Sequence, residues 1–412
     1  MRSPRVHLPT KGRTLADLEA QMTERKAEDA DWRGGRTFSL VYPAGEEVDR
    51  VLRWANEMYV FENALNPFRF PSLRHMEHEV VDMTLGLLNA PEGAGGTMTS
   101  GGTESILMAV KTARNRARRE RDVDRPEIIL PISAHPAFAK AAEILCLEVR
   151  HAPLADDLRV DVGEVARLIN SQTVLIVGSA PNYPHGMIDP IPELASLAGE
   201  RDISFHTDAC VGGFLLPFLE RLGEPVPPFD FRVPGVTTMS ADVHKYGYAT
   251  KGASVIAHRD RATLEHQIFL YDQWPGGLYG SPALAGARPA APVAVAWAIL
   301  SYLGEEGYLG LTRRVRDTAR RLREGIEAID GLHIWGDPPA SLLAFGSQKV
   351  DIMAVGDVMD DRGWHLDRQV NPDALHLMIS PEHDRIVEEF LADLRDGVAN
   401  HGPRRGTEAR YS

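Results

Sequence analysis

Residues 240–257 read SADVHKYGYATKGASVIA, a lysine-bearing segment punctuated by glycine that ends in the apolar run Ser254–Ala257. The apolar run predicts a buried strand, and a lysine in a short loop beside such a strand is unusual. An amine whose pKa is lowered by its surroundings can form a Schiff base. Lys245 and Lys251 lie six residues apart, so composition alone cannot choose between them. A lysine on a solvated loop is the plainer interpretation.

The segments before this stretch alternate between short apolar runs and amphipathic helices. Helices are predicted over Glu104–Arg119 and Ile191–Arg201. Further strands are predicted at Ile128–Pro131, Thr173–Val177 and Ile203–Thr207. Strand and helix alternation favours an α/β domain with a mostly parallel sheet, which we place at residues 61–305. Ligands of such sheets bind beyond the carboxyl ends of the strands.

A glycine pair opens the predicted helix at Glu104–Arg119. The sequence there is Thr99-Ser100-Gly101-Gly102-Thr103-Glu104-Ser105. Paired glycines let the backbone approach an anion, and a helix N-terminus offers free N–H groups and a favourable dipole. Ser100 and Thr103 add hydroxyl donors. A glycine turn with a threonine cap is the plainer alternative.

A carboxylate ends the predicted strand at Ile203–Thr207. The strand runs into His206-Thr207-Asp208-Ala209-Cys210. A carboxylate at the end of a parallel strand points into the ligand crevice, where it can keep a pyridine nitrogen protonated. An aspartate that caps the following turn is the alternative. Phosphate cradle, carboxylate and lysine together are the three anchors of a fold-type I pyridoxal-phosphate (PLP) enzyme.

The rest of the chain predicts an arm, a small domain and a tail. Residues 1–60 mix charge with helical stretches and indicate an N-terminal arm. Apolar residues at 290–300 predict a buried helix, and Tyr308–Ile329 a long one. Three apolar runs and a last helix over Glu382–Val398 predict a small C-terminal α+β domain at 306–400, followed by a tail at 401–412. The runs are Leu332–Trp335, Leu342–Phe345 and Leu375–Ile379.

Charge and cysteine content exclude several classes of protein. The chain of 412 residues carries 45 basic and 58 acidic residues, a formal net charge of −13, which argues against a general binder of nucleic acid or anionic membranes. Its two cysteines cannot form a disulfide framework and fit a reducing cytoplasm. No apolar run reaches the ~18 residues needed to span a bilayer. We expect a cytoplasmic protein without a membrane span or a metal.

At these residues the chain resembles the sphingosine-1-phosphate lyases, in the group II decarboxylase branch of fold-type I PLP enzymes. The resemblance covers most of the chain, from about Tyr42 to about Val398. It is densest in Thr99–Arg114, Ser179–Pro190, His206–Phe214 and Phe229–Gly252, and it continues through Trp274–Pro289. It implies a large domain with a mostly parallel seven-stranded sheet, a small C-terminal domain and a homodimer with shared active sites.

The resemblance also assigns roles to single residues. Lys245 matches the Schiff-base lysine, Asp208 the partner of the pyridine nitrogen and His135 the histidine that stacks on the ring. Lys251 and Tyr42 match residues that contact the phosphate of the substrate, and Tyr42 is expected from the other subunit. Ser281 matches a serine that reaches the phosphate of the cofactor across the dimer interface. Tyr183 and Asn66 match residues near the substrate. Gly101, Gly102, Thr103 and His244 match the site of the cofactor phosphate. The plainer interpretations are a core histidine for His135, packing of the arm for Tyr42 and a structural turn for Ser281.

One departure concerns the substrate. Family members carry a longer loop after the asparagine, with a histidine that contacts the substrate phosphate. Here the segment reads Asn66-Pro67-Phe68-Arg69-Phe70-Pro71, without that histidine. Arg69 could supply the charge, since guanidinium binds phosphate well, or the site could have been reshaped for a substrate without phosphate.

The resemblance implies retro-aldol cleavage of a phosphorylated long-chain amino alcohol to an aldehyde and phosphoethanolamine. Tyr183, Lys251 and His135 are candidates for proton transfer, and the sequence does not choose among them. PLP-dependent decarboxylation of an L-amino acid is the first alternative. A PLP-binding scaffold without turnover is the second, although the lysine and aspartate that turnover needs are both present.

Overall fold

The computed structural model of the chain describes residues 5–66 and 68–405. Its centre is a seven-stranded sheet with the strand order β1-β7-β6-β5-β4-β2-β3. The pairs from β6 to β3 are parallel, whereas β7 pairs antiparallel with both β1 and β6. The strands are β1 (Gly95–Thr99), β2 (Glu127–Pro131), β3 (Glu148–Ala152), β4 (Thr173–Ser179), β5 (Ser204–Asp208), β6 (Thr238–Ala241) and β7 (Ser254–His258). The predicted mostly parallel seven-stranded sheet is confirmed.

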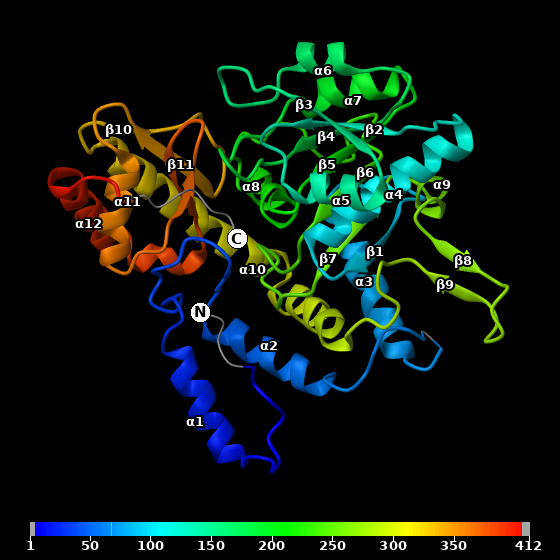
Figure 1. Cartoon of the computed structure of the whole chain (residues 1–412), viewed down its shortest axis with the longest axis horizontal. Helices are drawn as coiled ribbons and strands as arrows, with labels where there is room; N and C mark the ends of the chain where they lie inside the picture. Colours follow the sequence, from blue (N-terminus) through cyan, green and yellow to red (C-terminus); the bar gives the residue numbers. More distant parts are fainter. Residues whose placement is uncertain (1–4, 67, 406–412) are drawn as a thin grey trace.

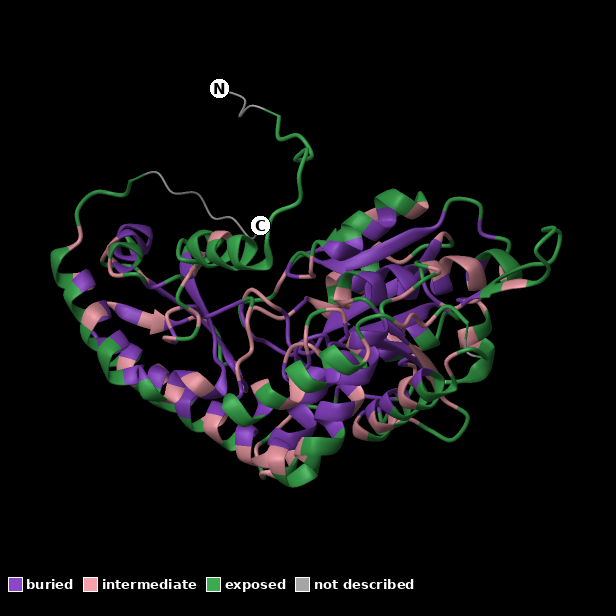
Figure 2. Ribbon diagram, turned by 90° about the horizontal axis from the view of Figure 1, so that it is seen from below, coloured by how far each residue is buried: buried purple, intermediate pink, exposed green. Residues whose placement is uncertain are grey.

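Apolar residues on both faces of the central strands bury the sheet. On β2, Ile128 and Leu130 pack with α4 (Gly102–Glu120), whereas Ile129 faces the other core, which contains Leu194 of α7 (Ile191–Gly199). This alternation is the period-two pattern of a strand. Figure 2 shows the buried strands enclosed by helices whose outer faces are exposed. The remaining helical elements around the sheet are α3 (Pro71–Leu87), α5 (Ala137–Leu145), α6 (Val162–Leu168), η1 (Gly212–Phe214), α8 (Leu216–Arg221) and α9 (Arg261–Glu265).

A four-stranded antiparallel sheet with the order β10-β11-β13-β12 forms the core of the small domain. It lies beside the large domain in Figure 1. Its elements are β10 (Leu332–Ile334), β11 (Leu342–Ser347), α11 (Ile352–Asp361), β12 (Asp367–Gln369), β13 (Ala374–Met378), η2 (Pro381–Arg385) and α12 (Val387–Asn400). The apolar runs predicted three of the four strands. They missed β12, because its three residues, Asp-Arg-Gln, carry no apolar pattern.

Helix α10 (Ala290–Glu327) joins the two domains and differs from the prediction. The two helices expected at 290–300 and 308–329 form one run with a kink at Gly304, whose φ of 52° and ψ of −172° break the helical backbone. Glycine tolerates this positive φ. The last predicted helix also begins later, because Pro381–Arg385 form a 3₁₀ turn before α12 starts at Val387.

Two segments extend away from the rest of the chain. Helix α1 (Leu15–Lys26) has no buried residue, although α2 (Glu46–Met58) packs against α10. The hairpin of β8 (Phe269–Tyr271) and β9 (Tyr279–Ser281) projects at the right of Figure 1. Its exposed apolar side chains are Phe269, Leu270, Tyr271, Trp274 and Leu278. Contiguous exposed apolar groups are typical of interaction surfaces.

Candidate active site

The three predicted anchors meet in one cavity of about 350 Å³. Asp208 is the last residue of β5, and Lys245 lies in the loop between β6 and β7. The glycine pair lies at the junction of β1 and α4. The lining of the cavity includes Ser100, Gly101, Gly102, Thr103, His135, Tyr183, Asp208, His244 and Lys245. We call these nine residues the inner cluster. The cavity lies at the carboxyl ends of the parallel strands β4 and β5, as the predicted sheet requires.

The first turn of α4 has an open N-terminus. Its N-cap residue is Gly101, with a φ of 153°, and no side chain caps the helix, so the alternative of a threonine cap is wrong. A Cβ atom on Gly102 would lie 2.8 Å from Asp242 Oδ2 and 2.9 Å from Cys210 Sγ, so any larger residue would displace these two side chains. The uncapped N–H groups and the helix dipole make this turn a site for an anion.

Ser100 differs from its predicted role as a donor to that anion. Its backbone N–H and its hydroxyl both donate to Glu104 Oε2, at 2.8 and 2.6 Å. The other oxygen of Glu104 accepts from the backbone N–H of Leu284, at 2.8 Å. Buried Glu104 therefore ties the start of α4 to the segment that follows the β8–β9 hairpin. No pattern in the sequence predicts this role of Glu104.

Asp208 is held by hydrogen bonds to one of its two oxygens. Oδ1 accepts from the Cys210 backbone N–H and from the Ser240 hydroxyl, both at 3.1 Å. Ser240 also lies 3.2 Å from Nε2 of His206, and burial lowers the pKa of that histidine to about 4, so it is neutral near pH 7. Within the described residues Oδ2 accepts no hydrogen bond. A buried carboxylate fixed on one side and open on the other can bind a protonated ring nitrogen.

Lys245 forms an ion pair with Asp242, whose Oδ2 lies 3.0 Å from the Lys245 amine. Burial favours the neutral amine, but the Asp242 carboxylate overrides it and holds the pKa of Lys245 well above its ordinary value. The expectation of a lowered lysine pKa is therefore wrong for Lys245. It missed Asp242, which stands three residues before the lysine in the quoted stretch.

Hydrogen bonds make the lysine loop rigid. The Lys245 N–H donates to Asp242 O at 3.2 Å, and the Tyr246 hydroxyl reaches Ile379 O of the small domain at 2.8 Å. His244 Nδ1 accepts from the Ala253 N–H at 3.3 Å, so in the neutral ring Nε2 carries the proton. Burial lowers the pKa of His244 to about 4. His244 therefore offers the cavity a neutral donor beside the glycine turn.

Lys251 and Tyr42 lie together at the edge of the lysine loop. The Lys251 amine is 4.6 Å from the centre of the Tyr42 ring and 3.4 Å from His244 O. Lys251 as a residue is exposed, but burial of its amine and the charge of Lys245 lower its pKa to about 8. The lower pKa of Lys251 would favour it as the nucleophile, whereas only Lys245 of the two lysines lines the cavity.

Tyr42 reaches this loop from the same chain, which differs from its expected origin in a partner. Its hydroxyl donates to Met378 Sδ at 2.6 Å, and its ring packs edge-on against Tyr246 at 5.4 Å. The arm therefore packs on its own small domain as well as beside Lys251.

His135 and Tyr183 form the wall between the inner cavity and a second one of about 410 Å³. His135 Nδ1 accepts from the Ala137 N–H at 3.1 Å, and burial lowers the pKa of this histidine. The Tyr183 hydroxyl donates to Asp367 of β12. The sequence could not associate Asp367 with the site, because it belongs to the small domain, 184 residues further along the chain.

Five predicted residues do not line the inner cavity. Two of them, Tyr42 and Lys251, lie at the edge of the lysine loop, and we call the other three, Asn66, Arg69 and Ser281, the outer cluster. Asn66 and Arg69 are exposed, and Asn66 Oδ1 accepts the backbone N–H groups of Phe68 and Arg69 at 3.0 and 3.2 Å. Asn66 borders another cavity of about 490 Å³, together with Gly280 and Pro282 on either side of Ser281. The Ser281 hydroxyl donates to Ala283 O at 2.9 Å, which is a structural turn within its own chain.

The inner cluster fits PLP. The open turn of α4 suits a phosphate, the free oxygen of Asp208 suits a pyridinium nitrogen, and Lys245 supplies the amine. Cys210 also lines the cavity, but burial raises the pKa of its thiol well above the ordinary value, so it stays protonated. Within residues 5–66 and 68–405, no group of three or more His, Cys, Asp or Glu side chains is arranged to hold a metal ion.

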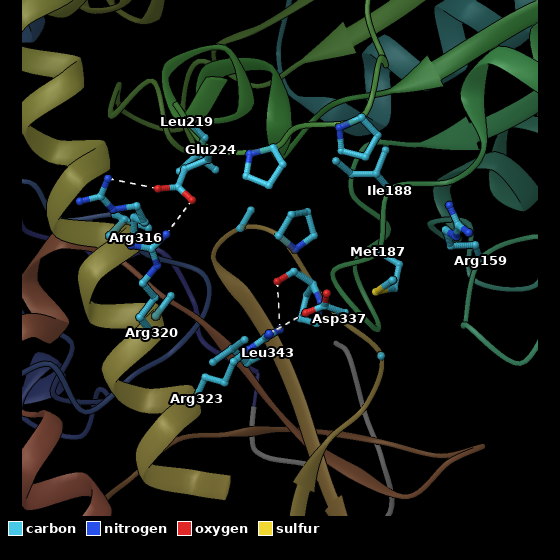
Figure 3. Close-up of a pocket in the computed structure, with 18 of the residues that line it drawn as sticks. Arg159, Met187, Ile188, Leu219, Glu224, Arg316, Arg320, Arg323, Asp337 and Leu343 are labelled. Atoms are coloured by element: carbon cyan, nitrogen blue, oxygen red, sulfur yellow. Dashed lines mark hydrogen bonds and ion pairs between the residues drawn. The ribbon is translucent and has the colours of Figure 1, made fainter. Parts of the chain in front are cut away.

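A larger cavity of about 680 Å³ lies between α10 and the loops of both domains (Figure 3). Arginines project into it, but each is paired with a carboxylate. Arg316 and Arg320 contact Glu224 at 3.2 and 2.7 Å, and Arg323 contacts Asp337 at 2.6 Å. None of the predicted site residues lines this cavity.

Comparison with known proteins gives a consistent result. Residues 56–348 match the family model described as the pyridoxal-dependent decarboxylase conserved domain. A sphingosine-1-phosphate lyase of Arabidopsis thaliana is 44% identical over 97% of this chain and 75% of its own length. A probable sphingosine-1-phosphate lyase of Legionella pneumophila is 33% identical over 90% of this chain and 63% of its own.

Solved structures give the same picture. The structure of a sphingosine-1-phosphate lyase from Burkholderia pseudomallei superposes with a TM-score of 0.93 at 40% identity, covering 97% of this chain and 93% of that one. A glutamate decarboxylase of Lactobacillus brevis shares the fold with a TM-score of 0.84 at 18% identity, over 97% of this chain and 95% of that one. Across the part of the chain that the structure describes, no helix combines the length and apolar character needed to cross a membrane.

Proposed function

Because this chain belongs to the sphingosine-1-phosphate lyases, within the pyridoxal-dependent decarboxylase family, we propose that it cleaves a phosphorylated long-chain amino alcohol. It is a PLP-dependent lyase. The proposed products are a long-chain aldehyde and phosphoethanolamine. The observation that carries the proposal is the convergence of Lys245, Asp208 and the open turn of α4 on one cavity.

The cofactor, when bound, supplies an electron sink that lets a bond at the carbon bearing the amine break. The residues of the chain hold it for that task. Lys245 is the proposed covalent anchor, and Asp208 Oδ2 the partner of the ring nitrogen. The backbone of Gly101, Gly102 and Thr103, with the neutral Nε2–H of His244, would bind its phosphate. His135 would pack against the ring.

The substrate would lie on the side of Lys251 and Tyr42. The Lys251 amine, with a pKa of about 8, is largely protonated at pH 7 and can pair with a phosphate. Tyr42 limits where that amine can move, because the cation lies over its ring. These two residues are the proposed contacts with the substrate phosphate.

We further propose a homodimer in which the outer cluster of one chain completes the site of the other. Asn66, Arg69 and Ser281 lie outside the inner cavity of their own chain, and Ser281 ends a hairpin whose exposed apolar residues suit burial in an interface. A closed two-fold dimer buries the same surface on both chains and builds both sites at once. The two cysteines are unpaired, and a reducing cytoplasm remains the proposed location.

Product identification tests the proposed reaction. PLP-loaded enzyme is incubated with a phosphorylated long-chain base and, in parallel, with the same base without phosphate, and products are identified by mass spectrometry. Aldehyde and phosphoethanolamine from the phosphorylated base alone would support the proposal. Aldehyde from both bases would show that the enzyme does not require the phosphate of the substrate. Release of CO₂ from L-amino acids without aldehyde from either base would replace the lyase by the decarboxylase.

A further inference from the structure

Strand β12 of the small domain has two faces with different tasks. Successive side chains of a strand point to opposite sides, so Arg368 faces away from Asp367 and Gln369. Arg368 is buried and pairs with Asp357 at 2.8 Å and with Asp360, both on α11. This ion pair fixes the strand to its own domain. The other face, with Asp367 and Gln369, can contact the large domain.

That other face binds the edge of the inner cavity. Asp367 accepts the hydrogen bond of the Tyr183 hydroxyl. Two residues along, Gln369 Nε2 donates to Pro184 O at 2.5 Å. The small domain therefore holds two consecutive residues of the large domain, and one of them, Tyr183, lines the cofactor cavity.

The direction of the Tyr183 hydrogen bond limits what its oxygen can do. A phenol has one proton to donate, and Tyr183 donates it to Asp367. Towards the cavity the oxygen can then only accept a proton. Donation to a carboxylate is a strong, charge-assisted bond, which polarises the phenol further. Asp367 thus gives Tyr183 the character of a base.

Neighbouring groups support a localised negative charge at Asp367. The His376 ring lies 4.5 Å from the Tyr183 ring, and His376 pairs with Asp367 across β12 and β13. Burial lowers the pKa of both His376 and His185 to about 4, so neither is charged near pH 7. Neither histidine can neutralise the carboxylate that accepts from Tyr183.

We propose that Asp367 is a positioning residue, which fixes Tyr183 as the acceptor of the substrate hydroxyl proton during carbon–carbon cleavage. This inference rests on the proposed function. The substrate O–H proton moves to Tyr183 Oη as the phenol proton moves to Asp367. The O–H electron pair forms the aldehyde C=O bond. The pair of the broken C–C bond stays on the carbon bearing the amine. That carbon takes a proton from Tyr183 as Asp367 returns the phenol proton, which gives the amine product and restores both residues, so charge and atoms balance.

The test uses the holoenzyme of wild type, Asp367→Asn, Tyr183→Phe and the double variant. With the phosphorylated long-chain base, we expect kcat to fall about 100-fold in Tyr183→Phe and about 10-fold in Asp367→Asn, with KM changed less than about twofold. The double variant should fall no further than Tyr183→Phe, because two residues that act as one unit are not additive.

Asp360→Asn is the matched control. It is the same substitution and also removes a contact of β12, here the ion pair between Asp360 and Arg368 on the face away from Tyr183. We expect it to leave kcat within about twofold of wild type, since surface-side pairs contribute little. An equal loss of kcat in Asp360→Asn and Asp367→Asn would overturn the inference, because both would then act by loosening the strand.

A thermal cycle tests the contact without turnover. In cofactor-free protein, Asp367→Asn and Tyr183→Phe should each lower Tm by about 2–4 °C, and the double variant by less than the sum. Additive shifts, or additive losses of kcat in an active enzyme, would overturn the inference alone. A wild type that releases no aldehyde would instead refute the proposed function, and the proton step with it.

Discussion

The inner and outer clusters contain residues expected in one site, yet they differ in burial and in their hydrogen bonds. Inner residues such as Asp208 and Lys245 are held by buried hydrogen bonds and ion pairs at 3.0–3.1 Å. In the outer cluster, Asn66 and Arg69 are exposed, and the hydroxyl of buried Ser281 donates to Ala283 O within its own chain. One chain therefore brings the inner residues together in a single cavity and leaves the outer residues away from it. Holding the cofactor and selecting the substrate become separable tasks.

Replacement of the lysine should have the largest effect on the inner cluster. Lys245→Ala should abolish the visible absorbance of bound PLP and lower kcat at least about a thousandfold, because the anchoring amine is lost. Lys251→Ala is the control and should keep the absorbance band, since Lys251 lies outside the cavity lining. Absorbance spectra of the purified proteins decide this. A band that persists in Lys245→Ala but disappears in Lys251→Ala would mean that Lys251, which has the lower pKa, binds the cofactor.

Mixing of variants tests whether the outer cluster acts across the dimer. A triple variant, Asn66→Ala, Arg69→Ala and Ser281→Ala, should lose about 100-fold in kcat/KM. Mixed after mild dissociation with Lys245→Ala, it should recover about a quarter of wild-type activity, because half of the dimers gain one intact site of two. The control is each variant taken through the same treatment alone. No recovery in a mixture shown to contain hybrid dimers would place the outer cluster in its own chain's site, or in none.

Much of the inner cluster could be predicted because its signals are local. The glycine pair, the strand-ending Asp208 and the lysine loop each lie within a few residues of a strong strand pattern. The sequence could not predict which groups surround them. The pKa of Lys245 is raised because the Asp242 carboxylate outweighs the effect of burial, and the role of Ser100 changes because its hydroxyl donates to Glu104. Asp367 was missed because its strand is short and polar, and only the folded chain brings it to Tyr183.

The network behind Asp208 should give an intermediate effect. Ser240→Ala removes one of the two donors to Asp208 Oδ1, and we expect the dissociation constant of PLP to rise at least about tenfold, since a hydrogen bond to a charged group contributes about 1.5–3 kcal/mol. Titration of apo-protein with PLP, followed by absorbance, measures it. Ser133→Ala is the matched control, because its buried hydroxyl makes no hydrogen bond among the described residues. Equal effects of the two variants would mean that loss of any buried serine matters.

Lys251 belongs to neither cluster, and its titration should make KM for the phosphorylated base depend on pH. Its pKa is lowered to about 8 by burial, so the amine is charged below that pH and neutral above it. If the charge binds a phosphate, KM for the phosphorylated base should rise up to about tenfold between pH 7 and 9. KM for a base without phosphate should stay flat. Lys251→Arg, which remains charged, should remove the rise. The same rise for both bases would assign the titration to another group.

Arg69 provides the smallest and most specific test of the outer cluster. Its side chain is exposed at the end of a turn held by Asn66, so it can reach a substrate only from the rim. We expect Arg69→Ala to raise KM for the phosphorylated base about three- to fivefold, with kcat unchanged, because an exposed charge contributes at most about 1 kcal/mol. Arg74→Ala, a nearby arginine on α3, is the control. Steady-state kinetics with both bases measure the effect. If KM rises equally for the base without phosphate, Arg69 shapes the entrance and does not bind the phosphate. Binding of the substrate phosphate would then depend on Lys251, and the loop after Asn66 would make no contact with the phosphate.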